Sequence, residues 1–154
     1  MSAVYSHPVA ACRRMTKQDL PAIVRIEQRS YQFPWTGNIF LDCLRHGYSG
    51  WVLETNLGII GYGVMSLMVR ECHLLNLCVD PDYRGQGKGR QLLEEMLGIA
   101  RTQEADTVFL EVRISNFHAL SLYLSEGFNE IGTRRNYYPS PMGREDAVIL
   151  ARKL

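Results

Sequence analysis

The fold of this chain is decided by one run of sequence, Val79-Asp80-Pro81-Asp82-Tyr83-Arg84-Gly85-Gln86-Gly87-Lys88-Gly89-Arg90, which combines a strand end, a glycine-rich turn and a helix start. At a helix start several backbone N–H groups lack intrahelical partners and the helix dipole is positive, while glycines let an anion approach the backbone. The run therefore predicts a phosphate-binding turn between a strand and a helix.

Two common phosphate-binding motifs can be tested on this turn by counting. A Walker A loop needs a glycine five positions before Gly87 and a serine or threonine after Lys88, but the chain has Asp82 and Gly89 at those positions. A dinucleotide fingerprint would need its third glycine where the chain has Arg90. Both motifs are therefore excluded.

Helix and strand patterns alternate on both sides of the turn. After the turn, apolar residues recur at i, i+3, i+4 and i+7 over positions 93–100, which is one face of a helix. Thr16 with Asp19, and later Thr36, are predicted to cap two earlier helices. The other predicted elements are strands at 9–14, 51–53, 59–69, 73–79, 107–112, 128–135 and 147–151, and helices at about 16–32, 36–47 and 116–126. This order predicts one α/β domain over residues 1–154, with a frayed N-terminus at residues 1–8.

Composition excludes several classes of protein. With 154 residues, 46% of them hydrophobic, the chain has enough apolar side chains for a folded core. A net charge of +1 gives no broad basic surface, so we expect no direct nucleic-acid partner. The longest uncharged apolar stretch, 58–69, is shorter than the roughly 20 residues that cross a bilayer, and the first residues lack a signal-peptide pattern. We therefore expect a cytoplasmic protein with no membrane partner.

The cysteines do not indicate a metal site. The four cysteines form no C-x-x-C pair. In a strand, Cys72 and Cys78 would lie on one face about 20 Å apart, too far to share a metal with His73. We therefore expect reduced, mostly buried thiols and no metal.

The segment from Arg84 to Gly89 resembles the R/Q-x-x-G-x-G/A loop with which the GNAT N-acetyltransferases hold the pyrophosphate of acetyl-CoA. The alternative is a glycine turn that serves only close packing. The resemblance implies a single GNAT-type domain, with a mixed, mostly antiparallel sheet of about seven strands flanked by about four helices. In one respect the turn departs from the usual pattern, because Gly85 stands where a side chain often faces the phosphates.

Two residues downstream could carry the proton chemistry of acetyl transfer to an amine. The ammonium must lose a proton before it attacks, and the departing thiolate is best released with one. Glu111 lies near the end of a predicted strand, and Tyr123 lies on the next helix. Taken alone, Glu111 could simply face solvent or pair with Arg113, and Tyr123 could simply pack in the core.

Three later segments resemble a narrower group within that family, the RimI-type ribosomal-protein-alanine N-acetyltransferases of bacteria. These segments are 110–116, Asn136-Tyr137-Tyr138-Pro139 and Gly143-Arg144-Glu145-Asp146-Ala147. The resemblance implies direct transfer from acetyl-CoA to the N-terminal alanine of a small-subunit ribosomal protein, in a ternary complex without an acyl-enzyme. It also implies that Glu111 is the general base and Tyr123 the general acid.

The same resemblance implies the contacts to acetyl-CoA. They are Leu77, Cys78, Val79, Arg84, Gly85, Gln86, Gly87, Lys88, Gly89, Arg90 and Asn116. We expect the backbone of 77–79 to bind the pantetheine arm and an N–H near Val79 to stabilise the oxyanion. The Cys78 side chain is expected to pack in the core.

Aromatic residues are the candidates for the walls of the acceptor site. They are Phe33, Trp35, Tyr137 and Tyr138, with the tyrosine pair expected in a loop. The alternative for Trp35 and Tyr138 is that each anchors its own loop by packing. Two other functions stay open: a GNAT enzyme that acetylates a small amine or antibiotic, and a non-catalytic module that binds acetyl-CoA.

Overall fold

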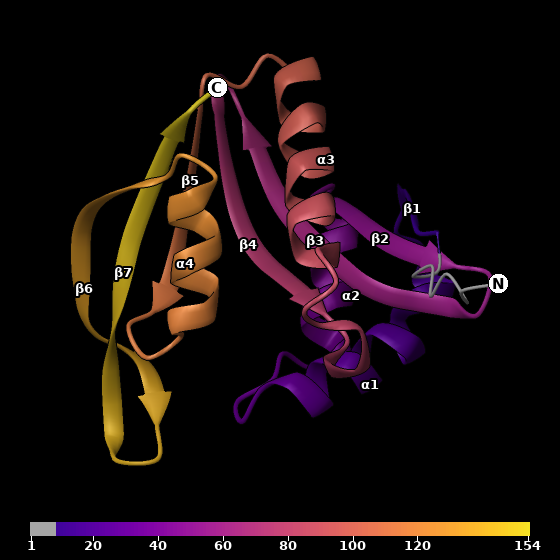
Figure 1. Cartoon of the computed structure of the whole chain (residues 1–154), viewed down its shortest axis with the longest axis horizontal. Helices are drawn as coiled ribbons and strands as arrows, with labels where there is room; N and C mark the ends of the chain where they lie inside the picture. The colour runs from indigo at the N-terminus through magenta and orange to yellow at the C-terminus, as the bar shows by residue number, and fades with distance from the viewer. Residues whose placement is uncertain (1–8) are drawn as a thin grey trace, which may run out of the picture. The chain divides into compact units, whose positions relative to one another are not determined.

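The computed structural model describes residues 9–154, so the frayed terminus expected at residues 1–8 lies outside the described residues. The elements in chain order are β1 (Ala11–Arg14), η1 (Lys17–Asp19), α1 (Leu20–Ser30), α2 (Gly37–Arg45), β2 (Ser49–Thr55), β3 (Gly58–Met68), β4 (Glu71–Val79), η2 (Pro81–Tyr83), α3 (Lys88–Thr102), β5 (Thr107–Arg113), α4 (Phe117–Ser125), β6 (Asn129–Ser140) and β7 (Gly143–Lys153). The strands form a seven-stranded sheet in the order β1-β2-β3-β4-β5-β7-β6, as Figure 1 labels them. β4 and β5 are parallel, whereas β1–β2, β5–β7 and β6–β7 are antiparallel. The expectation of a mixed, mostly antiparallel α/β sheet is confirmed.

The described chain forms two compact units. One holds the chain up to Val64 together with Leu77–Glu95, and the other holds Met65–Asn76 together with Met96–Leu154. β3, β4 and α3 contribute residues to both units. That residues 1–154 form one domain remains a prediction, which this division into two units does not test.

In the first unit, hydrogen bonds to side chains fix the entry into α1. The Asp19 carboxylate accepts the Thr16 backbone N–H at 2.7 Å, as the predicted capping arrangement requires. The Arg13 guanidinium bridges the carboxylates of Asp19 and Glu54, each at 2.8 Å. Because Arg13 and Glu54 lie on the paired strands β1 and β2, this bridge ties the helix start to the sheet.

α1 ends two residues earlier than the sequence predicts. Tyr31 is already extended, and its N–H bonds back to the Glu27 carbonyl at 3.1 Å. The buried Glu27 carboxylate then accepts the Trp35 backbone N–H at 2.9 Å. The next helix, α2, begins where predicted, because the Thr36 hydroxyl accepts the Ile39 N–H at 3.3 Å.

The second unit is built on β5, which lies between β4 and β7 in the sheet. Its residues alternate between buried and partly exposed, with Val108, Leu110 and Val112 buried. The odd-numbered residues therefore share the other face, and this face carries Glu111.

The β6–β7 hairpin is longer than predicted, and Figure 1 shows its yellow end projecting beyond α4. The expectation that Tyr137 and Tyr138 lie in a loop is wrong, because both belong to β6 and Tyr138 pairs with Glu145. The strand register shifts between Arg134 and Tyr138, and Asn136 has a φ of +51°. This bulge interrupts the two-residue alternation that would have revealed the strand.

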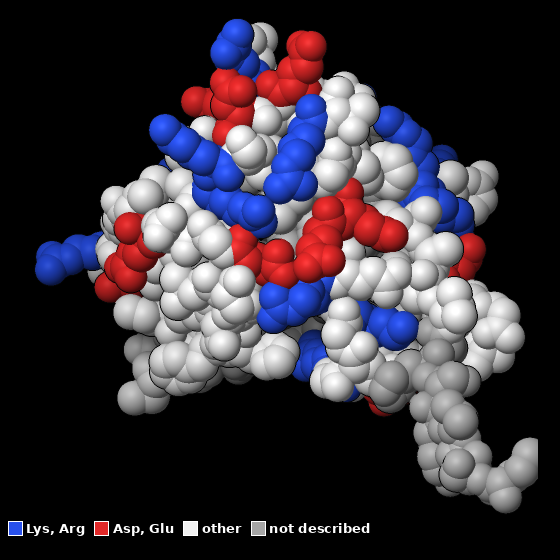
Figure 2. Space-filling view, turned by 45° about the horizontal axis from the view of Figure 1, so that its top comes forward, with Lys and Arg blue, Asp and Glu red and all other residues white. Residues whose placement is uncertain are grey.

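On the face shown in Figure 2, basic and acidic side chains are interspersed, in keeping with the net charge of +1. Among residues 9–154, no helix is both long enough and apolar enough to span a membrane.

Candidate active site

The glycine turn of the first unit has a conformation that only glycine adopts readily. Gly85 and Gly87 have φ angles of +75° and +74°. A Cβ placed on either residue would meet no described atom within 4 Å. Close packing therefore does not explain these glycines. Gly61 is the contrasting case, because its Cβ would lie 3.0 Å from the Cys78 carbonyl oxygen.

The residues before the turn are held by hydrogen bonds and ion pairs. The Asp80 carboxylate accepts the Asp82 backbone N–H at 2.9 Å, and the Asp80 N–H donates to the Ile60 carbonyl at 2.7 Å. The Arg29 guanidinium lies 3.1 Å from both the Asp80 and the Asp82 carboxylates. Sequence reasoning missed Arg29, whose partner Asp80 is 51 positions away along the chain.

The start of α3 has the groups that a diphosphate requires. The helix has 15 residues and begins at Lys88, so its first N–H groups follow the two left-handed glycines directly. Lys88 is buried, whereas Arg84 and Arg90 are exposed. The Arg84 Nε donates to the Val79 carbonyl at 3.3 Å. The Oε1 atom of Gln86 is buried and has no hydrogen-bond partner among residues 9–154. Backbone donors and cations together fit the pyrophosphate of a coenzyme.

The strand end before the turn also lies in the first unit. The Tyr31 hydroxyl donates to the Leu77 carbonyl at 3.3 Å. Cys78 is 4% exposed, and its Sγ lies 3.8 Å from the Val79 carbonyl oxygen. The thiol therefore packs in the core, as expected.

The second unit places Glu111 in a defined ionic environment. Its side chain is 13% exposed, with Oε1 lying 3.3 Å from Arg134 Nε and Oε2 lying 3.4 Å from His73 Nε2. Arg113 instead contacts Glu145 Oε1 at 2.9 Å and the Pro139 carbonyl at 2.6 Å. A Glu111 that faces solvent or pairs with Arg113 is therefore excluded.

A pocket of about 320 Å³ opens beside the Glu111 carboxylate. Its lining consists of Ser66, Met68, Glu71, Cys72, His73, Phe109, Glu111, Arg134 and Ile149. The pocket is partly apolar, and His73, Glu111 and Arg134 contribute ionisable groups to its wall. Sequence reasoning considered His73 only as a metal ligand, and it missed Arg134.

Tyr123 and Asn116 belong to α4 and its cap. Tyr123 is buried, and its ring packs edge-on against Phe128 with centroids 5.6 Å apart. Asn116 is the N-cap, and its Oδ1 accepts the Ala119 N–H at 3.2 Å. Both residues therefore have a structural role in the second unit.

Two of the four acceptor candidates, Phe33 and Trp35, lie in the first unit. The Trp35 ring packs against Phe40 with centroids 5.2 Å apart, and its backbone is bound to Glu27. These contacts support the alternative that Trp35 anchors its loop. Phe33 is 41% exposed, which suits a contact surface better.

The other two candidates, Tyr137 and Tyr138, lie in the second unit. Their rings meet at 81° with centroids 4.8 Å apart. The Arg113 guanidinium lies 4.4 Å from the Tyr138 ring centroid, and the Arg134 guanidinium lies 5.3 Å from that of Tyr137. Burial raises the pKa of Tyr138 to about 12, and the nearby Glu111 carboxylate contributes to this rise. The tyrosine pair and Glu111 therefore belong to one electrostatic cluster.

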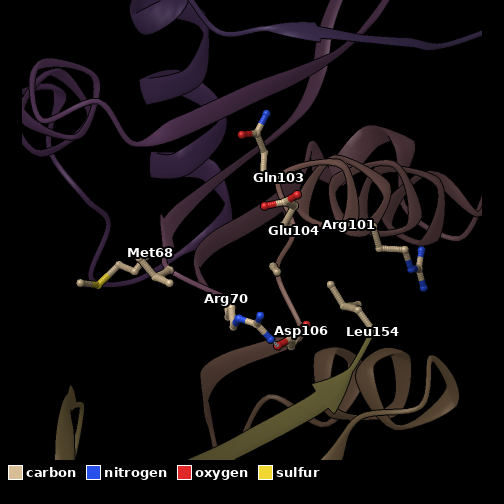
Figure 3. A pocket seen from close by; sticks show the side chains of 9 residues that line it. Met68, Arg70, Arg101, Gln103, Glu104, Asp106 and Leu154 are labelled. Atoms are coloured by element: carbon tan, nitrogen blue, oxygen red, sulfur yellow. Dashed lines mark hydrogen bonds and ion pairs between the residues drawn. The ribbon is translucent and has the colours of Figure 1, made fainter.

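A larger pocket of about 610 Å³ contains none of the predicted site residues. Figure 3 shows its labelled side chains, among which Arg70 pairs with Asp106 at 3.2 Å. The residues around it are Met68, Val69, Arg70, Arg101, Gln103, Glu104, Ala105, Asp106 and Leu154. Pocket size alone therefore does not locate the site that the sequence motifs indicate.

Comparisons with known proteins agree with one another. A model of the acetyltransferase (GNAT) family matches residues 10–128. The chain is 44% identical over 133 residues to the [ribosomal protein bS18]-alanine N-acetyltransferase of Escherichia coli strain K12, covering 86% of this chain and 90% of that protein. It is 32% identical over 143 residues to a putative enzyme of the same description from Bacillus subtilis strain 168, covering 92% and 93%.

Solved structures give the same picture. The ribosomal-protein-S18-alanine N-acetyltransferase from Escherichia coli superposes with a TM-score of 0.89 at 40% identity, covering 94% of each chain. Ard1 from Thermoplasma volcanium superposes with a TM-score of 0.84 at 28% identity, covering 94% of this chain and 97% of that one.

Proposed function

The chain belongs to the acetyltransferase (GNAT) family, and from this premise we propose that it transfers the acetyl group of acetyl-CoA to the N-terminal alanine of ribosomal protein bS18. The observation that carries the proposal is the 44% identity to an enzyme of that activity over 86% of the chain. We place the reaction in the cytoplasm, where newly made ribosomal proteins are available.

Acetyl-CoA supplies a thioester whose carbonyl carbon is attacked by the acceptor amine. The α3 start and the cations Arg84, Lys88 and Arg90 bind the diphosphate. The backbone of Leu77–Val79 extends along the pantetheine arm, and an N–H near Val79 stabilises the oxyanion of the transition state. Asn116 adds a further contact.

Glu111 and Tyr123 move the protons in this proposal. The Glu111 carboxylate takes a proton from the acceptor ammonium, so that the free amine can attack. The Tyr123 hydroxyl gives a proton to the departing sulfur. The transfer is direct and needs no cysteine, which agrees with the burial of Cys78.

In this proposal, aromatic side chains form the walls of the site that holds the acceptor. Phe33, Tyr137 and Tyr138 form its walls, and Trp35 supports the loop that carries Phe33. The exposure of Phe33 and the proximity of the tyrosine pair to Glu111 support this arrangement.

Mass spectrometry of short peptides incubated with the protein and acetyl-CoA tests the proposal. The set contains the N-terminal sequence of bS18, variants that begin with Ser, Met or Gly, and the same peptide with its α-amine blocked. We expect an acetyl group on the α-amine of the Ala-starting peptide and none on the blocked one. Transfer to polyamines or aminoglycosides alone would instead indicate a small-amine enzyme. Binding of CoA without transfer to any acceptor would indicate a binding module.

A further inference from the structure

A general base that is 13% exposed must lose its proton again after each turnover. The inference below rests on the proposed function, because it concerns the route by which Glu111 is deprotonated. The carboxylate is mostly buried and lines the pocket of about 320 Å³, so the proton leaves through this pocket. The neighbours of the carboxylate therefore decide the route.

Two nitrogen groups among the described residues lie within 4 Å of the Glu111 carboxylate oxygens, those of Arg134 and His73. A guanidinium is always protonated in proteins and cannot accept a proton. A neutral imidazole can accept one at a ring nitrogen near neutral pH. His73 is thus the neighbour with the required chemistry.

The position of the imidazole agrees with this role. His73 Nε2 is buried, has no hydrogen-bond partner among residues 9–154, and lies 3.4 Å from Glu111 Oε2. The His73 side chain as a whole is 39% exposed, three times the fraction of Glu111. Nε2 is therefore close to the carboxylate but not hydrogen-bonded to it, and a small rotation of the partly exposed side chain would align the two atoms for proton transfer.

We propose that His73 relays to solvent the proton that Glu111 takes from the acceptor ammonium. In the first transfer an ammonium N–H bond breaks and a Glu111 O–H bond forms. In the second transfer that O–H bond breaks as a bond from Nε2 to hydrogen forms, and the imidazolium then releases its Nδ1 proton to water. Both residues return to their starting charges, and the imidazole, which now carries its proton on Nε2, regains the Nδ1–H tautomer by proton exchange with water, so no further reactant is needed.

The strands around His73 bring few other charges to it. On β4 itself, Glu71 lies two residues away on the same face. β5 contributes Glu111, and β6 contributes Arg134. β3 contributes Ser66 and Met68, which carry no charge. The neighbouring Cys72 thiol is buried beside Met65, with the two sulfurs 3.5 Å apart.

The test is acetyl transfer by His73→Ala at low buffer concentration, with and without added imidazole. Without imidazole we expect kcat to fall by at least about tenfold, less than for loss of the base itself, while KM for the peptide stays unchanged. Added imidazole should restore kcat in the variant and leave the wild type unaffected. His73→Gln, which keeps a polar group beside Glu111 but cannot accept and release a proton near neutral pH, should behave in the same way.

His46→Ala is the matched control, because it removes an exposed imidazole at the end of α2. It should keep the wild-type kcat. An unchanged kcat in His73→Ala would overturn the proposal, and so would a fall that imidazole does not restore. If His73→Gln keeps the wild-type kcat in the absence of imidazole, His73 only positions Glu111, and the relay is rejected. A wild type that fails to acetylate the peptide would reject the proposed function instead, so the two failures are distinguishable.

Discussion

The Tyr62 hydroxyl donates a hydrogen bond of 2.6 Å to the Glu27 carboxylate, and both side chains are buried. The other carboxylate oxygen of Glu27 accepts the backbone N–H of Trp35, in the loop that also carries Phe33. Burial, followed by the nearby Cys78 and Glu27, raises the pKa of Tyr62 far above its ordinary value, so the phenol stays a donor. A polar pair in the core thus holds a loop of the proposed acceptor site.

Tyr62→Phe should lower the free energy of unfolding by about 2 kcal/mol, because a buried carboxylate loses a hydrogen-bond donor. Urea denaturation measures the change. Tyr48→Phe, at an exposed tyrosine, is the control and should stay within about 0.5 kcal/mol of the wild type. Equal stabilities of Tyr62→Phe and the wild type would show that the hydrogen bond contributes nothing.

Glu111→Gln should reduce kcat by roughly 10²- to 10⁴-fold without unfolding the protein, because an amide cannot take the ammonium proton. Steady-state acetylation of the bS18 peptide gives kcat, and thermal unfolding checks the fold. The control is Glu130→Gln, which changes an exposed carboxylate on β6. A near-normal rate for Glu111→Gln would remove Glu111 from the mechanism.

Gly87→Ala should raise the Kd for CoA by about tenfold, since a left-handed conformation costs an L-residue about 1–2 kcal/mol and the turn relaxes away from it. Calorimetric titration with CoA measures the affinity. Gly98→Ala is the matched control, because Gly98 lies within α3 and a Cβ there also meets no described atom within 4 Å. Identical affinities of the two variants would argue against a phosphate-binding turn.

Asp19 should make stability depend on pH in acid. Hydrogen bonds from Arg13 lower the pKa of Asp19 from 3.8 to about 2. This stabilisation is fully present above the pKa of the unfolded carboxyl and is lost as the pH falls through the folded value, between about pH 4 and pH 2. It amounts to about 2 kcal/mol.

Asp19→Asn should therefore be less stable than the wild type at pH 7 by about 2 kcal/mol, and the difference should shrink below pH 4. Unfolding in urea at several pH values measures it. Asp106→Asn, in the exposed pair with Arg70, should change stability by less than about 1 kcal/mol. A difference between Asp19→Asn and the wild type that persists unchanged at pH 2 would contradict this account.

Much of the fold could be predicted because its signals are local. The apolar stripe of α3, the threonine caps at 16 and 36 and the alternation along β5 each depend on residues a few positions apart. The sequence does not predict the end of β6. Its bulge at Asn136 breaks the two-residue alternation, so the pattern places Tyr138 in a loop.

Only those residues of the candidate site that belong to sequence motifs could be predicted. The glycine turn and the family resemblance point to Gly87 and Glu111 without any knowledge of the fold. His73 could not be found in this way, because its contact with Glu111 depends on β4 and β5 being parallel neighbours. Which strands become neighbours depends on the topology of the whole sheet, and no local sequence pattern predicts it.

β6 is the last strand of the sheet, so one row of its backbone N–H and C=O groups faces no other strand within residues 9–154. A strand of a second polypeptide can pair with such an edge through these backbone groups, and repeated pairing of this kind leads to aggregation. The bulge at Asn136 and the missing N–H group of Pro139 make this edge irregular, and Arg134 and Arg135 give it positive charge. The irregularity that makes this strand hard to predict from the sequence thus also disfavours edge-to-edge aggregation, while Tyr137 stays exposed on the strand.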